Sequence, residues 1–161
     1  MPRVLPLLVL LSIAPVAARA QEVDSVQHVS AAALREAVAP APGEAERAMV
    51  GRLVADRGYT LLALRRTADG EAEIHADWDD VIVVQEGGAT LLHGGTVKGG
   101  RETAPGERRG GRIDGGTLQP LAPGDLVLVP AGTPHQVLVL AGRSVSYLVV
   151  KVQRVPPSVP E

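Results

Sequence analysis

The segment GDLVLVPAGTPHQVLV (residues 124–139) is the most informative stretch of this 161-residue sequence. It begins with a Gly-Asp turn signal, and an apolar, largely β-branched run follows and ends at Pro130. Pro130 and Gly132 predict a tight corner, because proline fixes its φ angle and glycine reaches conformations that other residues avoid. His135 opens a second apolar run. The segment therefore predicts two strands joined by a tight turn, with a histidine at the start of the second strand.

The strand pattern continues on both sides of this segment. Five further runs are strand-like, and two of them, 80–86 and 144–152, are rich in β-branched residues: 59–66, 71–75, 80–86, 89–93 and 144–152. An Ala-Asp-Gly sequence at 68–70 predicts a hairpin between the first two runs. Residues 94–116, rich in glycine and charge, predict a long loop with one or two short strands. Seven or so strands without helices between them predict an antiparallel sandwich or barrel, and the nearly continuous apolar runs favour a small barrel.

The N-terminal residues have the features of a secretory signal peptide. Arg3 provides a basic start, an apolar run follows, and Ala18-Arg19-Ala20 is a cleavage motif. The apolar run contains two prolines and is short for a membrane span, so an N-terminal membrane anchor is the less favoured alternative. We therefore expect cleavage after Ala20, a periplasmic or secreted mature protein, and no stable membrane insertion after cleavage.

The remaining chain divides into three regions. Residues 21–58 form an N-terminal leader that contains a short helix over 30–38, with Ser30 as its N-cap, and a second short helix or turn over 44–50. Residues 59–152 form the barrel, and residues 153–161 form a Pro-rich tail.

Composition excludes several classes of function. The chain has no cysteine, which excludes disulfides, thiolate metal sites and a thiol nucleophile. The mature chain keeps 14 basic residues against 18 acidic ones, a net charge of about −4, because the signal peptide removes two arginines and no acid. This mildly acidic balance gives no reason to expect nucleic acid as a partner.

Segment 124–139 resembles the second conserved motif of the cupin superfamily, in which a glycine, a proline, a glycine and a histidine recur at this spacing. Gly124, Pro130, Gly132 and His135 match all four positions. The family's trailing asparagine is absent, and Val139 stands in its place.

A second segment, EIHADWDDVIVVQEG (residues 73–87), resembles the first cupin motif with two departures. His75 matches the second histidine of the motif, and Gly87 matches its glycine. Asp80 stands where the family has glutamate, and Glu73 stands where it has its first histidine. The resemblance covers roughly residues 59–152. It implies an all-β fold, a small antiparallel jelly-roll (cupin) β-barrel, here with one or two short N-terminal helices, and an interior that commonly holds one divalent metal.

Four residues are the candidate metal ligands: Glu73, His75, Asp80 and His135. Glu73 and His75 share one face of a predicted strand, and the resemblance places His135 across the barrel from them. Two imidazoles and two carboxylates suit a divalent transition metal, namely Mn, Fe, Zn, Ni or Co. We rank the histidines first, then Glu73, and Asp80 last, because aspartate is one methylene shorter than the family's glutamate. In the alternative interpretation, residues 77–80 are a solvated acidic turn and the histidines are a hydrogen-bonded pair.

Two further residues are candidates for the pocket. Two crowded carboxylates need a cation between them, and Arg65 or Arg66 on the preceding strand is the expected arginine. Trp78 either stacks on a ligand at the rim or acts as an apolar plug that fixes the loop. Tyr147 is expected to be a core residue, and no catalytic residue is assigned.

Three functions are consistent with these observations. The first is an extracytoplasmic, metal-dependent cupin that acts on a small polar metabolite; as an enzyme it would be of the dioxygenase, isomerase or lyase type, with Glu73 or Asp80 as a proton shuttle. The second is a non-catalytic cupin that binds a small sugar or acid without metal. The third is a structural or dimerising module. In each case the family's habit suggests a homodimer.

Overall fold

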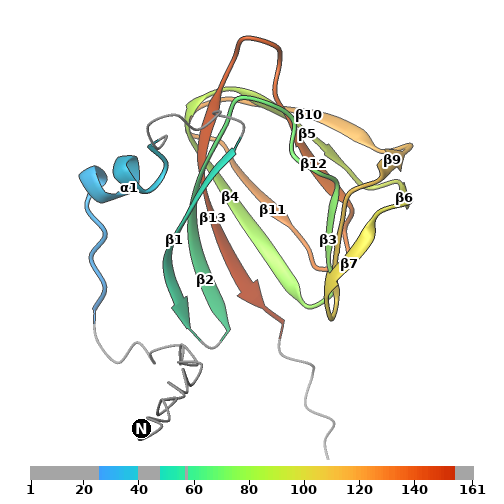
Figure 1. Ribbon diagram of the computed structural model, residues 1–161, viewed down its shortest axis with the longest axis horizontal. Coiled ribbons are helices and arrows are strands. Elements are labelled where there is room, and N and C mark those ends of the chain that lie inside the picture. The colour runs from blue at the N-terminus through green and yellow to red at the C-terminus, as the bar shows by residue number, and fades with distance from the viewer. Residues whose placement is uncertain (1–25, 40–47, 57, 155–161) are drawn as a thin grey trace, which may run out of the picture.

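Two facing antiparallel sheets form the body of the protein (Figure 1). The computed structural model describes residues 26–39, 48–56 and 58–154. The first sheet has five strands in the order β1 (Ala48–Asp56), β2 (Tyr59–Arg66), β13 (Val145–Gln153), β4 (Trp78–Gly87) and β11 (Leu126–Val129). The second has six strands in the order β10 (Thr117–Leu121), β5 (Ala89–His93), β12 (His135–Leu138), β3 (Glu73–His75), β8 (Glu107–Arg109) and β7 (Arg101–Ala104).

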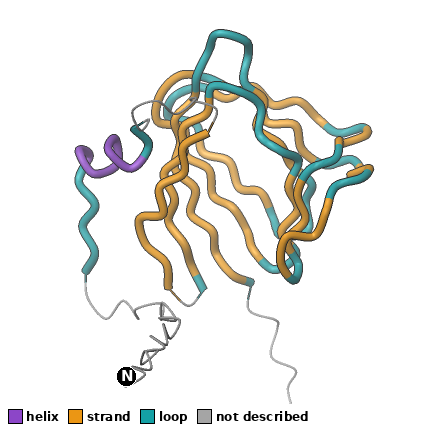
Figure 2. Tube along the Cα trace, in the orientation of Figure 1, coloured by secondary structure: helices purple, strands orange, loops and turns teal. Residues whose placement is uncertain are grey.

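Two smaller elements complete the structure. Strands β6 (Thr96–Lys98) and β9 (Arg112–Asp114) pair with each other at the outer end of the six-stranded sheet (Figures 1 and 2). Helix α1 (Ala31–Ala37) lies beside β1, and the Ser30 side chain caps it by accepting a hydrogen bond of 3.2 Å from the amide of Ala33. The predicted helix over 30–38 and its N-cap are thereby confirmed. Within the described residues, no helix is long and apolar enough to cross a membrane.

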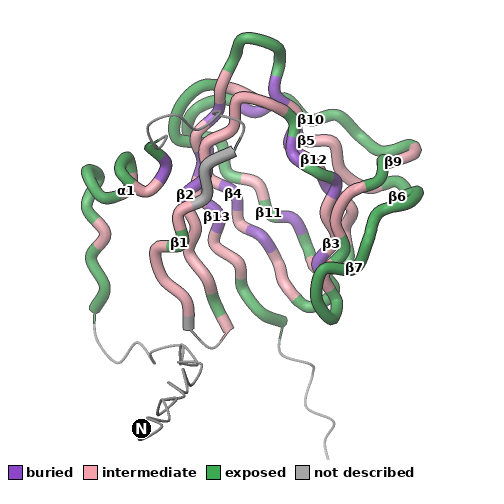
Figure 3. The backbone as a smooth tube through the Cα atoms, viewed as in Figure 1, coloured by how far each residue is buried: buried purple, intermediate pink, exposed green. Residues whose placement is uncertain are grey.

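The core lies between the two sheets and is almost entirely aliphatic, as the lack of phenylalanine requires. Its buried members alternate along their strands: Leu64, Ile82, Val84, Leu91, Leu121, Val129, Val137, Val139, Val145, Tyr147 and Val149. Figure 3 shows buried stretches on strands of both sheets. Because side chains of a strand alternate between faces, the same alternation also directs His75, Asp80 and His135 inward, where each is at most 5 % exposed. The predicted all-β barrel class is confirmed.

Several local predictions were wrong. Residues 48–56 form the edge strand β1, so the five-stranded sheet begins N-terminal to Tyr59. A second helix or turn had been expected over 44–50; residues 48–50 are strand, and residues 44–47 lie outside the described residues. Residues 94–116 hold four short strands and not one or two, because glycine-rich turns let them fold back as hairpins. The Ala-Asp-Gly turn at 68–70 joins β2 of one sheet to β3 of the other and does not form a hairpin.

Some predictions fall outside the described residues. These are the signal peptide over 1–20 and the Pro-rich tail beyond Arg154.

The two motif glycines Gly87 and Gly132 serve different purposes. Both have a positive φ, +74° at Gly87 and +80° at Gly132, which disfavours other residues. A Cβ added at Gly87 would also collide with the carbonyl oxygen of Ser144, whereas one at Gly132 would meet no atom within 4 Å. Gly87 therefore satisfies a packing constraint as well as a conformational one.

We expect Gly87→Ala to lower the free energy of unfolding by about 3 kcal/mol or more, because the backbone strain and the steric collision add. Gly132→Ala should cost only about 1–2 kcal/mol, the conformational part alone. Urea unfolding of the two variants beside the parent protein measures the difference. Equal losses in both variants would contradict this account of Gly87.

Candidate metal centre

Glu73, His75 and His135 come together where β3 and β12 pair at the centre of the six-stranded sheet. Glu73 lies directly opposite His135 in the register, and His75 lies two residues further on the same face of β3. One ligand atom from each residue, a carboxylate oxygen or a ring nitrogen, lies within 4.8 Å of those of the other two. The group could therefore hold a metal ion.

His75 is held by a carboxylate on the neighbouring strand. Glu107 of β8 lies directly opposite it in the register, and Glu107 Oε2 is 2.5 Å from His75 Nδ1. An ionised carboxylate only accepts, so we infer that Nδ1 carries the proton of that hydrogen bond. The other ring nitrogen, Nε2, is buried and lies 3.3 Å from a carboxylate oxygen of Glu73 and 3.3 Å from one of Asp80. This arrangement is typical of a metal-binding histidine, whose other ring nitrogen donates a hydrogen bond to a carboxylate that orients the ring.

His135 is anchored in the same way by the backbone. Its Nδ1 lies 3.0 Å from the carbonyl oxygen of Thr133, which can only accept, so Nδ1 donates and Nε2 is left as the basic nitrogen. The two imidazole rings are tilted by 57° with centroids 5.2 Å apart. Both histidines thus have a fixed Nδ1 and an Nε2 on the side of the carboxylates.

Asp80 is paired with a lysine. It faces Lys151 across the β4–β13 register, and its Oδ1 lies 2.7 Å from Lys151 Nζ. Its second oxygen, Oδ2, is 3.3 Å from His75 Nε2 and 3.6 Å from His135 Nε2. Burial alone would raise the pKa of Asp80, but His135, His75 and Lys151 together hold it well below its ordinary value. Asp80 is therefore buried and ionised, which excludes the solvated-turn interpretation for this residue.

Glu73 is paired with Arg109, which lies directly opposite it on β8. Burial would raise the pKa of Glu73, but the hydrogen bond with His75 and the charge of Arg109 lower it instead. Glu73 Oε2 lies 3.3 Å from His75 Nε2.

The surrounding carboxylates change the protonation of His75. Burial would lower its pKa, but Asp80 and Glu73 outweigh burial and raise the pKa to about 9. In the metal-free protein His75 is therefore a cation at neutral pH. A divalent metal would replace this proton, since a metal binds the neutral imidazole.

The donor set fits a divalent transition metal. It offers two ring nitrogens and one carboxylate oxygen with a second carboxylate nearby, and Nε2 of the buried His75 faces both carboxylates. Imidazole together with carboxylate suits Mn, Fe, Co, Ni and Zn, and no thiolate is present to favour a softer ion.

Of the other predicted pocket residues, Arg66 lines the inner cavity and Arg65 does not. Arg65 lies on the outer face of β2, where it lines a cavity next to α1, so it does not separate the carboxylates. Arg66, its neighbour on β2, lines the inner cavity with Glu73 and Asp80. Trp78 is partly buried on the same face of β4 as Asp80, but it is not among the residues that line that cavity.

Three residues of the site were missed from the sequence: Glu107, Arg109 and Lys151. Glu107 and Arg109 lie in the glycine-rich stretch that was interpreted as a loop, and Lys151 ends an otherwise apolar run. The run from Val145 to Val149 has buried residues at every second position, so a lysine in the same phase at 151 could have indicated an inward charge.

The comparisons with known proteins support the fold. No protein-family model and no curated protein matches this chain. Among solved structures, a conserved Klebsiella pneumoniae protein with a double-stranded β-helix domain is 14% identical, with a TM-score of 0.57 over 80% of this chain and 91% of that one. The polyketide cyclase RemF from Streptomyces resistomycificus is 18% identical, with a TM-score of 0.53 and 83% of each chain covered. The cupin domain of Schizosaccharomyces pombe Cnp3 is 7% identical, with a TM-score of 0.51 over 66% of this chain and 65% of that one. The fold is therefore the cupin type of double-stranded β-helix.

We expect Lys151→Met to lower the free energy of unfolding of the metal-free protein by about 2–3 kcal/mol, because it leaves the buried Asp80 carboxylate without its nearest cation. The double variant Asp80→Asn/Lys151→Met should recover part of this loss, since it removes both charges. Urea unfolding in the presence of a chelator measures both. Lys98→Met, an exposed lysine on β6, is the matched control and should change stability little. Equal effects of Lys151→Met and Lys98→Met would contradict the pairing.

Proposed function

We propose that this protein binds one divalent transition metal through Glu73, His75 and His135 and acts there on a small polar metabolite. The observation that supports this most is the pair of anchored histidines. Each donates Nδ1–H to an oxygen, from Glu107 or from Thr133, and keeps Nε2 on the side of the carboxylates. Nε2 of the buried His75 lies 3.3 Å from carboxylate oxygens of both Glu73 and Asp80, so ring nitrogens and carboxylates converge where one cation could bind them together.

The chain's own residues determine what the site can do. A bound metal would supply a Lewis acid that polarises an oxygen atom of the ligand. Glu107 and Thr133 orient the imidazoles, and His135, His75 and Lys151 together keep Asp80 ionised. An ionised, buried Asp80 next to both histidines can serve as a fourth metal ligand, whereas its lowered pKa makes it a weak proton acceptor.

The fold alone does not identify the reaction. It is shared with a polyketide cyclase and with the cupin domain of Cnp3, and a single fold carries many unrelated functions. The extracytoplasmic location and the homodimer stay predictions.

One observation favours a second candidate, a metal-free protein that binds a small ligand. The charged groups of the site already balance one another in pairs, Glu73 with Arg109, Asp80 with Lys151 and Glu107 with His75. A site of this kind does not need a cation to be stable. Metal content decides between the two candidates.

We expect the purified protein to contain close to one equivalent of transition metal, and His75→Ala and His135→Ala to lose at least about nine-tenths of it. Glu73→Gln should lose more metal than Asp80→Asn, because Asp80 is already paired with Lys151. Mass spectrometry of acid-digested protein measures the content, and circular dichroism checks that each variant is folded. If no metal is bound after loading with Mn, Fe, Co, Ni or Zn, the metal-free candidate replaces this one.

We expect Glu107→Gln to weaken metal affinity by about 10–100-fold without removing a ligand, because it weakens the hydrogen bond that orients His75. A competition titration with a chromophoric chelator gives the affinity. Glu102→Gln, on the adjacent strand β7 and exposed, is the matched control and should retain the parent affinity. The idea fails if the two variants bind metal equally well.

A further inference from the structure

A small, partly open space lies next to the metal-binding group, inside the barrel. Its cavity volume is about 40 Å³. The residues that line it are Leu64, Arg66, Gly70, Glu71, Glu73, Asp80, Ile82, His135, Gln136, Val137 and Tyr147. Since a water molecule needs roughly 10–15 Å³ of such volume, the space holds a few water-sized groups. A functional group of three heavy atoms fits it, and a whole metabolite does not.

The Arg66 guanidinium is held in a defined position in this space. Its Nε donates a hydrogen bond of 2.7 Å to the hydroxyl of Tyr147, a diagonal neighbour across the β2–β13 register. Tyr147 is 4 % exposed, so its hydroxyl belongs to the interior. A hydroxyl that accepts from Arg66 still has its own proton to donate. Arg66 and Tyr147 together therefore present donors to whatever occupies the space.

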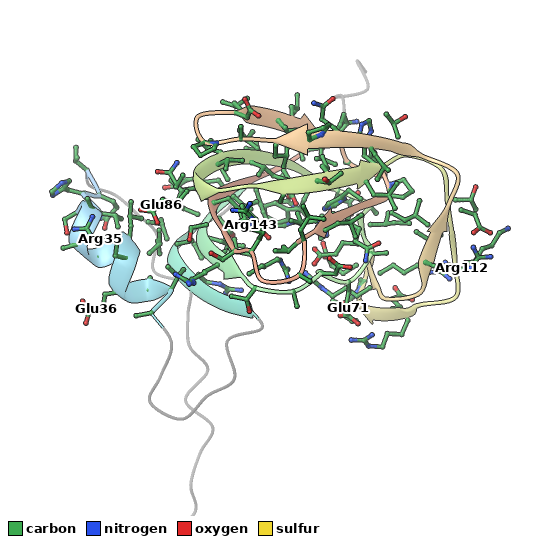
Figure 4. The ribbon with its side chains drawn as sticks, turned by 90° about the horizontal axis from the view of Figure 1, so that it is seen from above. Arg35, Glu36, Glu71, Glu86, Arg112 and Arg143 are labelled. Atoms are coloured by element: carbon green, nitrogen blue, oxygen red, sulfur yellow. The ribbon has the colours of Figure 1, made fainter. Side chains whose placement is uncertain are left out.

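Gly70 makes room for this guanidinium. A Cβ added at Gly70 would lie 3.0 Å from Arg66 Cζ and 3.2 and 3.3 Å from its two terminal nitrogens. Gly70 does not have a positive φ, so its backbone conformation does not require glycine. Because Gly70 has no side chain, the guanidinium plane of Arg66 can lie close to the backbone at this position. The connection between β2 and β3 is thus shaped around Arg66. Figure 4 shows the adjacent Glu71 at the edge of the barrel.

Among the described residues, the charges of the site leave Arg66 without an acidic partner. Each nearby carboxylate has its own cation: Glu71 has Arg101, Glu73 has Arg109, Asp80 has Lys151 and Glu107 has His75. Among the described residues, the hydrogen-bond partner of Arg66 is the neutral hydroxyl of Tyr147. Binding of a divalent metal would add further positive charge beside it. An anionic group in the space would neutralise this excess.

We propose that Arg66 and Tyr147 form a subsite that binds the carboxylate group of a small organic acid. The guanidinium donates from its terminal nitrogens to the carboxylate oxygens, and the Tyr147 hydroxyl donates to one of them. A carboxylate fits the available volume better than a phosphate group, which carries four oxygens. This proposal rests on the proposed function only for the neighbouring metal, since Arg66, Tyr147 and Gly70 are positioned without it.

Acetate is the probe that tests the subsite. Its affinity for the whole protein is measured by isothermal titration calorimetry, once with metal loaded and once in the presence of a chelator. Acetamide, a neutral molecule of the same shape, and inorganic phosphate are titrated alongside. We expect acetate to bind more tightly than either. Weaker binding of acetate than of phosphate, or no acetate binding in either state, would overturn the proposal.

Variants identify the residues that are responsible. Arg66→Gln should weaken acetate binding by at least about 10-fold, and Tyr147→Phe by about 3-fold or more, because a charge-assisted hydrogen bond contributes more than a neutral one. Arg65→Gln removes the same charge one residue away on the outer face of β2 and should leave the affinity unchanged. Gly70→Ala keeps the guanidinium but displaces it, and it is the second variant if Arg66→Gln does not fold. Acetate binding that is unchanged in both Arg66→Gln and Gly70→Ala contradicts the proposal.

Failure of this proposal can be distinguished from failure of the metal site. If the protein binds metal and its affinity for acetate does not depend on Arg66, the carboxylate subsite is refuted and the metal site is not. Acetate binding that depends on Arg66 in a protein that holds no metal supports the subsite and refutes the metal-dependent function.

Discussion

The three-residue strand β3 is the element on which the site depends. It pairs with β12 on one side and with β8 on the other, and each pairing places one side chain directly opposite another. Glu73 thereby meets His135 and Arg109, and His75 meets Glu107. Because strand residues alternate in direction, a shift of one residue in this register would turn both Glu73 and His75 away from the interior. The metal-binding group is therefore a consequence of strand register.

The same physical rule arranges the charges on the other sheet. Lys151 faces Asp80 across β13 and β4, and Arg66 reaches Tyr147 diagonally across β2 and β13. Buried charges are costly unless each has a partner, so such groups are found as cross-strand pairs. The two sheets thus bring carboxylates, histidines and cations together within the barrel, while aliphatic side chains fill the rest of the interior.

Much of the fold could be predicted because it depends on local patterns. Apolar runs ended by glycine or proline identified β2, β4, β5, β11, β12 and β13, and the spacing of Gly124, Pro130, Gly132 and His135 indicated the barrel type. The short strands between residues 94 and 116 could not be predicted in this way. They contain few apolar residues, and they are strands because they pair with neighbours distant in the sequence or across glycine turns.

The sequence by itself determined the all-β class and that Glu73 and His75 share one face of a strand, since alternation along a strand is a local property. Only the tertiary structure decided what those residues contact. Whether Arg65 or Arg66 faces the interior depends on which face of β2 meets the core, and Glu107 reaches His75 only because β8 adds to the edge of β3. These contacts join residues 30 to 80 positions apart, and such distances are set by how the sheets pair and close.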